Sequence, residues 1–125
     1  MGIEQARKAA RKALERTYEG RATVYEYREV RDPDTYLTDF KKVAVLEDQP
    51  CKLSFKTLDT TTDTGHVAVM TQAVKLFLSP DVTIAAGSKI VVTQNGETTE
   101  YASSGVAAKF PTHQEIPLKL FDRWA

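Results

Sequence analysis

The sequence offers few side chains that could carry out chemistry. Its two histidines, His66 and His113, have no cysteine or acidic residue at the spacing of metal-binding motifs such as HxxxH or CxxC. Asp59, Asp63 and His66 could together bind a divalent ion weakly, but an exposed polar loop explains the same residues. Glu115 follows His113 at a spacing that an alternating strand also produces. We therefore expect no metal site.

Sequence signatures of the common enzyme classes are also missing. The chain contains no GxGxxG, GxxxxGK[ST], GxSxG or HExxH. The lone cysteine, Cys51, alternates with Leu53 and Phe55, which predicts a buried thiol that behaves as a small hydrophobic group. A single thiol cannot form an internal disulfide and fits a reducing compartment. We expect neither enzymatic activity nor a cofactor.

Length and charge place the chain among ordinary soluble domains. Its 125 residues suit one domain, and 42% apolar with 27% charged residues is typical of globular proteins. The formal net charge is zero, so no overall attraction to nucleic acid, membranes or acidic partners is expected. No apolar run approaches the roughly 18 residues of a membrane span, and the N-terminus lacks a signal peptide. We expect a protein that is soluble and cytoplasmic at synthesis.

Residues 1–19 are predicted to form an N-terminal helical segment. From Ile3 to Thr17 the chain lacks Gly and Pro, and a narrow, mostly alanine stripe recurs at helical spacing. Gly20 is expected to stop this helix. The remaining faces carry a local excess of positive charge, from Arg7, Lys8, Arg11, Lys12 and Arg16. This basic helix could dock on an acidic partner while its alanine face packs on its own barrel, could contact nucleic acid, or could be solvated without a partner.

Residues 20–125 are predicted to be rich in strands. The apolar pattern changes to a period of two, and Asp32-Pro33-Asp34 and Glu47-Asp48-Gln49-Pro50 read as breaks. Asn95-Gly96 between two strand-like runs is a strong signal for a two-residue hairpin. The predicted strands include 22–31, about 38–46, 51–56, 67–78 and 115–121. One helix followed by these segments predicts a single, mainly β domain: a small β-barrel or sandwich of about seven strands with one N-terminal α-helix.

A long polar loop is predicted at 57–66 between two of these strands. Its length exceeds the usual hairpin connection of about two to five residues, and such loops tend to be functional or disordered. It could pair with neighbouring copies, line an opening, or simply be mobile. Its polar members are Thr57, Asp59, Thr60, Thr61, Thr62, Asp63, Thr64, Gly65 and His66.

Five strings, in order along the chain, carry a resemblance to a known family. They are DQPCKLS at 48–54, VKLFLSP at 74–80, GSKI at 87–90, VTQNG at 92–96 and HQEI at 113–116. Together they resemble the small head–tail connector proteins of tailed phages and prophages of low-GC Gram-positive bacteria. Within that group the head-closure type, also called head-completion or stopper, is the most similar. The resemblance extends from about Arg21 to Trp124, and the N-terminal helix departs from the pattern.

The resemblance implies a structural protein of the virion neck that assembles in the host cytoplasm. Its subunits would form a ring, commonly of six or twelve copies, below the portal and adaptor. A tail terminator or tail tube would join the other face, and double-stranded DNA would pass through the channel. The loop at 57–66 would reach into that channel and help to retain packaged DNA. The alternatives are an adaptor or tail-terminator ring at the same junction, or, from another class, a monomeric barrel that binds nucleic acid through its basic helix.

Overall fold

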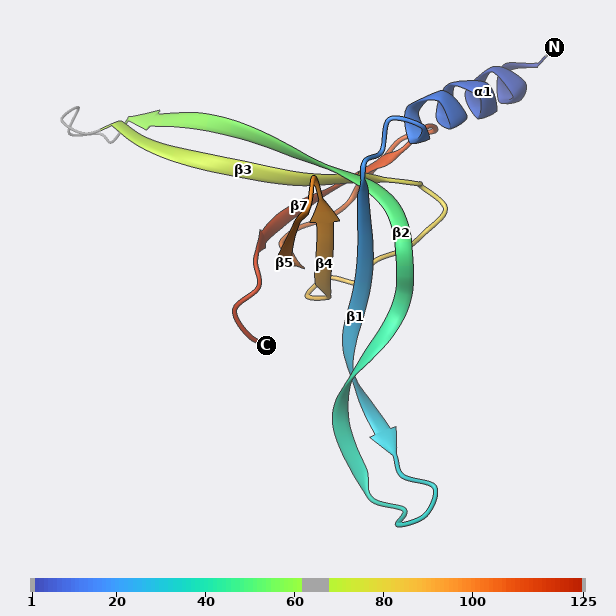
Figure 1. The fold of residues 1–125 in the computed structure, drawn as a ribbon, viewed down its shortest axis with the longest axis vertical. Helices are drawn as coiled ribbons and strands as arrows, with labels where there is room; N and C mark the ends of the chain where they lie inside the picture. Colours follow the sequence, from blue (N-terminus) through green and yellow to red (C-terminus); the bar gives the residue numbers. More distant parts are fainter. Residues whose placement is uncertain (1, 62–67, 125) are drawn as a thin grey trace.

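The residues that the structure describes form one helix followed by seven strands (Figure 1). The structure is a computed structural model that describes the backbone of residues 2–61 and 68–124. Within these ranges it describes the side chains of residues 2–57 and 72–124. The prediction of a mainly β chain with a single N-terminal helix is confirmed. The elements are α1 (Ile3–Glu15), β1 (Gly20–Arg31), β2 (Thr38–Thr61), β3 (Ala68–Leu78), β4 (Lys89–Gln94), β5 (Glu97–Ser103), β6 (Ala108–Lys109) and β7 (Gln114–Leu120).

The seven strands belong to one antiparallel sheet that closes on itself. Their order is β3-β2-β1-β4-β5-β7-β6, and β3 also pairs with β7. Six strands therefore form a continuous hydrogen-bonded ring, and the short β6 lies outside it against β7. Where a strand of this ring pairs with a neighbour on each side, it has no free edge. We refer to this ring of strands as the closed sheet.

The core lies inside the closed sheet and comes from alternate positions of its strands. Successive strand residues point to opposite faces, so positions two apart share the interior. Cys51 is fully buried, which confirms the prediction of a buried thiol, and burial raises the pKa of this thiol to about 12. The buried apolar cluster consists of Ala22, Val24, Cys51, Leu53, Leu76, Leu78, Ile90, Val92, Tyr101, Ile116 and Leu118.

The predicted hairpin at Asn95-Gly96 is confirmed. It joins β4 to β5, and Gln94 pairs directly with Glu97 across the turn. Asn95 and Gly96 both have positive φ angles, 53° and 79°. A two-residue type I′ turn needs this conformation at both central positions, and Asn and Gly adopt it with little strain.

The predicted break at 47–50 is a bend rather than the end of a strand. β2 continues through it, pairing first with β1 and then, from Cys51 onwards, with β3. Asp48 has a φ of 50°, and the register with β1 shifts on both sides of Val24. Such irregularities bend a strand without ending it. Pro50 lies just before the pairing with β3 begins, where a residue that lacks a backbone donor is tolerated.

Two hairpins extend beyond the closed sheet as two-stranded arms (Figure 1). In the β1–β2 arm, residues 26–31 pair only with residues 38–43, because β4 pairs with β1 no further than Tyr25. In the β2–β3 arm, residues 56–61 pair only with residues 68–73, because β7 pairs with β3 only from Val74. Two-stranded ribbons are at best marginally stable in water without further contacts.

The first part of the predicted polar loop is strand. Thr57, Asp59, Thr60 and Thr61 belong to β2 and pair with the start of β3, so the prediction of a loop there is wrong. β-branched threonine favours extended structure, and an arm outside the core does not need an apolar alternation to be a strand. The remaining predicted loop residues, Thr62, Asp63, Thr64, Gly65 and His66, lie outside the described residues.

Candidate assembly surfaces

Helix α1 has no buried residue and extends away from the closed sheet (Figure 1). Ala6, Ala10 and Ala13 are exposed, so the expectation that the alanine face packs on its own barrel is wrong. An alanine methyl group buries little apolar area, which leaves little energy to hold such a face against the sheet. The helix ends at Glu15, and Gly20 is the buried first residue of β1 rather than the helix stop.

Arg11 ties the helix to the loop that follows β3. Its Nη2 donates hydrogen bonds to Ser79 Oγ and, at 2.6 Å, to Asp81 Oδ2, while its Nε lies 3.4 Å from Glu15 Oε1. The prediction grouped Arg11 with Arg7, Lys8, Lys12 and Arg16 as partner-docking residues. Arg11 makes an internal contact instead, whereas the other four are exposed.

Gln114 holds the same loop from the inside. Its side chain is fully buried at the start of β7, and its Nε2 donates to the carbonyl oxygens of Ser79 (2.7 Å) and Val82 (2.6 Å). Buried carbonyl groups in an irregular loop need such partners, because water does not reach them. The contacts therefore run from β7 through the loop to Arg11, and they fix the C-terminal half of α1 against this loop.

Replacing Arg11 by glutamine is expected to loosen the helix without unfolding the closed sheet. The contact with Asp81 is largely exposed, so the melting temperature should change little. Amide exchange in residues 3–15 should become faster, while exchange in β4 and β5 stays unchanged. The hydrogen bond from Arg11 lowers the pKa of the Asp81 carboxyl. In the unchanged protein the contact should therefore be present at pH values above the ordinary pKa of a carboxyl group, and it should be lost as the pH falls through the lowered pKa of Asp81. Arg7→Gln, on an exposed face of the same helix, is the control. Equal rates of amide exchange in residues 3–15 of the two variants would show that Arg11 does not anchor the helix.

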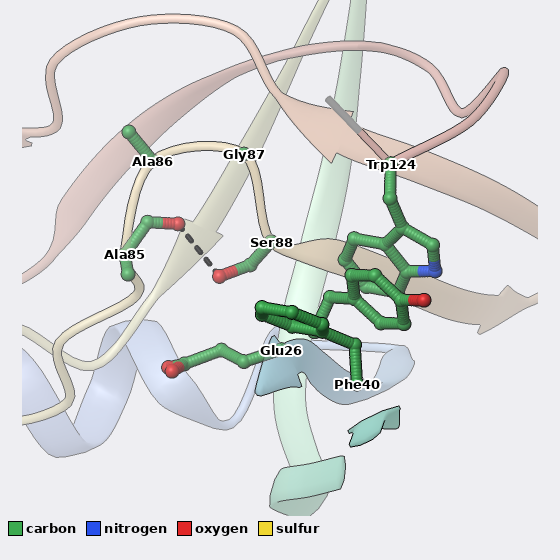
Figure 2. Close-up of a pocket in the computed structure, with 8 residues that line it drawn as sticks. Glu26, Phe40, Ala85, Ala86, Gly87, Ser88 and Trp124 are labelled. Atoms are coloured by element: carbon green, nitrogen blue, oxygen red, sulfur yellow. Dashed lines mark hydrogen bonds between the residues drawn. The ribbon is translucent and has the colours of Figure 1, made fainter. Parts of the chain in front are cut away.

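An aromatic groove lies at the root of the β1–β2 arm (Figure 2). Its volume is about 320 Å³, and Tyr27 is among its lining residues. Phe40 and Trp124 lie on one side of it and the backbone of residues 85–88 on the other (Figure 2). The Tyr27 ring stacks on Trp124 at a centroid distance of 5.3 Å and lies 5.5 Å from Phe40. Tyr27 and Phe40 are each about half exposed, so these aromatic side chains form a surface open to solvent.

The polar groups of the groove make local contacts. Ser88 Oγ donates to the carbonyl oxygen of Ala85 at 2.6 Å, as drawn in Figure 2. The Glu26 carboxylate accepts a hydrogen bond of 2.9 Å from Arg28 Nε. No sequence pattern marks this groove, because it forms only when the C-terminal segment folds back on β1. The aromatic residues Phe121 and Trp124 near the end of the chain were the available signal.

His113 belongs to a structural cluster between β3 and β7. Its ring stacks on Phe110 at 4.9 Å and meets the edge of Phe77 at 5.6 Å. His113 Nε2 lies 2.9 Å from Glu115 Oε2, and this hydrogen bond is the main cause of the lowered pKa of Glu115. Lys75 Nζ approaches the other Glu115 oxygen at 3.5 Å.

No metal centre is evident in the part of the chain that the structure describes. No group of three or more His, Cys, Asp or Glu residues there is arranged to hold an ion. Of the residues considered for a divalent ion, Asp59 lies in β2, while Asp63 and His66 are outside the described ranges. Among the described helices, none is long and apolar enough to cross a membrane.

Comparisons with known proteins give little beyond this description. No family model matches the chain, and no curated protein matches it either. Among solved structures, it is similar to the protein xkdH of the phage-like element PBSX from Bacillus subtilis, with a TM-score of 0.49 and 11% sequence identity. The alignment covers 80% of this chain and 91% of that chain. Similarity at this level carries no argument about function.

Proposed function

We propose that this chain is a structural subunit of a phage head–tail connector ring, and that its role is head closure. One observation carries the proposal: α1 and the two arms extend from the closed sheet without support from the core. Two-stranded ribbons and an amphipathic helix without a buried face gain stability when they contact other chains. A ring of identical copies supplies such contacts at every subunit.

The strings that resemble connector proteins support the proposal by where they lie. Residues 48–54 and 74–80 lie side by side, because Cys51 pairs with Leu78 and Leu53 with Leu76. Residues 87–90 and 92–96 make up most of β4 and its turn, and 113–116 begin β7. The resemblance thus falls mostly on strands of the closed sheet and on the segments next to them.

The β2–β3 arm suits a part that reaches into a DNA channel. It leads away from the closed sheet (Figure 1), and in sequence the remainder of the predicted channel loop follows its last residue in β2, Thr61. A channel through which DNA must slide should avoid a dense basic lining, because each neutralised phosphate strengthens binding. The loop residues at 62–66 are threonines, one aspartate, one glycine and one histidine, which meets that requirement.

Deleting the gene from the phage or prophage that encodes this chain tests the role directly. Head closure predicts DNA-filled heads that leak DNA and lack tails. Complete heads with overlong tails would instead indicate a tail terminator. A purified chain that stays monomeric and binds double-stranded DNA with a steep salt dependence would favour the nucleic-acid-binding alternative.

Shortening residues 62–66 to an Asn-Gly turn tests the loop within that role. The variant is expected to fold and to join the connector, since its closed sheet is untouched, but to lose retention of packaged DNA. The matched control keeps the length and replaces Thr62 and Thr64 by serine, which should retain DNA. Normal retention by the shortened variant would overturn the channel role and leave the ring intact.

A further inference from the structure

Helix α1 presents a shallow apolar depression flanked by positive charge. Gly2, Ile3, Gln5, Ala6 and Ala9 line a hollow of about 280 Å³, and Ile3 is 68% exposed. The small alanine side chains leave room there for a larger apolar side chain. Residues 3–16 contain five basic and two acidic residues, a net charge of three positive. The exposed basic residues are Arg7, Lys8, Lys12 and Arg16.

The tip of the β1–β2 arm, residues 29–39, has the complementary properties. Tyr36 and Leu37 stand out at its end, 69% and 70% exposed. The tip contains four acidic residues and one basic residue, a net charge of three negative. The basic residue, Arg31, lies over the Tyr36 ring at 5.2 Å. The acidic residues are Glu29, Asp34 and Asp39, which are exposed, and Asp32, which is partly buried.

The tip is held in shape before any contact forms. Asp32 Oδ1 accepts hydrogen bonds from the backbone N–H groups of Asp34 (2.8 Å) and Thr35 (3.3 Å). The backbone of Asp32 also bonds to Tyr36 and Leu37, and Tyr36 has a φ of 59°. A residue other than glycine keeps a left-handed conformation only where its surroundings fix it. A fixed pair of apolar side chains loses less entropy on docking than a mobile one.

The two surfaces lie far apart in the fold, with α1 at the top of Figure 1 and the β1–β2 arm tip at the bottom. The helix and the arm tip therefore cannot meet within one copy. Contact between different surfaces of identical copies is head-to-tail, and it produces a closed ring when the rotation between copies closes.

We propose that the β1–β2 arm tip of one copy docks on helix α1 of the next, with Tyr36 and Leu37 over the alanine depression and the acidic residues against the basic ones. The opposite charges of the two surfaces, and the fit of two exposed apolar side chains to an apolar depression, indicate that a second copy of this chain binds to α1. The inference rests on the proposed function, since it names a contact between subunits of the same ring.

Charge reversal tests the contact by self-association at low salt, measured by sedimentation velocity. Arg7→Glu, Lys8→Glu and Lys12→Glu together, or Glu29→Lys, Asp34→Lys and Asp39→Lys together, are each expected to weaken association by about tenfold or more, because like charges would face each other. Both sets combined in one chain should restore it, which a folding defect would not. Asp32 is left unchanged because it holds the turn. The matched control is the reversal of three exposed lysines elsewhere, Lys52, Lys109 and Lys119.

Disulfide trapping tests the same contact when association is too weak to measure by sedimentation. Leu37→Cys protein mixed with Ala6→Cys protein should give a mixed dimer under mild oxidation, and far more of it than Val106→Cys with Ala6→Cys. Val106 is 91% exposed, and the native Cys51 is buried and does not compete. Failure to trap the first pair, or association that survives reversal, would overturn the contact. Assembly that persists through other surfaces would leave the connector proposal standing, whereas the gene-deletion phenotype tests that proposal separately.

Discussion

Replacing Gln114 by leucine is expected to lower the free energy of unfolding by about 2–4 kcal/mol, because two carbonyl groups lose their hydrogen-bond donor. The Gln114 Nε2 group serves both Ser79 and Val82, and the side chain is fully buried. Leucine has a similar volume, so little of the loss comes from a cavity. Removing the buried Gln114 Oε1, which has no partner among the described residues, offsets part of the loss. Urea denaturation followed by far-UV circular dichroism measures the change.

The control for this variant is Gln72→Leu, at an exposed position of β3. It should change stability by no more than about 0.5 kcal/mol, as is usual for surface substitutions. A second readout is specific to the loop: amide exchange in α1 should become faster in Gln114→Leu, since the loop positions Ser79 and Asp81 for Arg11. Equal stability of the two variants would show that the loop does not depend on Gln114.

Replacing Gly20 by alanine is expected to destabilise the protein by about 1–3 kcal/mol through overpacking. A Cβ atom at this position would lie 3.0 Å from the Cys51 carbonyl oxygen, 3.0 Å from Gln94 Oε1 and 3.2 Å from Cys51 Sγ. The Gln94 side chain could move away, but its Oε1 accepts a hydrogen bond from the Leu53 backbone at 2.9 Å, which would then be lost. The midpoint of urea denaturation should fall accordingly.

Gly105→Ala separates this contact from the general effect of replacing glycine. Its Cβ would meet the Pro117 ring at 3.4 Å, an ordinary van der Waals distance. Removing glycine flexibility from the unfolded chain without strain in the fold is neutral or slightly stabilising. If the two alanine variants had the same denaturation midpoint, close approach at Gly20 would not be the reason for glycine there.

Local patterns predicted the rigid part of the fold well. Alternation placed Cys51 and Leu53 in the interior, and the Asn95-Gly96 pair located a hairpin whose turn has the expected backbone angles. Both features depend on interactions within a few residues, so a sequence shows them directly. The prediction of a loop at 57–61 was wrong, because a polar run fits a two-stranded arm outside the core as well as it fits a loop.

The candidate surfaces depended more on contacts between distant residues. Arg11 looked like its basic neighbours on the helix, yet its partner Asp81 is 70 residues away in sequence. Likewise, the groove forms only because Trp124 reaches Tyr27 across the fold. Spacing along the chain carries no information about such pairs.

The sequence by itself determined a mainly β chain with an N-terminal helix, a buried cysteine and a resemblance to connector proteins. It did so because alternation, helix propensity and turn residues act locally. Only the tertiary structure decided that β3 pairs with β7 to close the sheet, that β2 bends at 47–50 and pairs with two different strands, and that α1 is left without a buried face. Those outcomes follow from which strands meet and how much area each element can bury, and both depend on the whole chain.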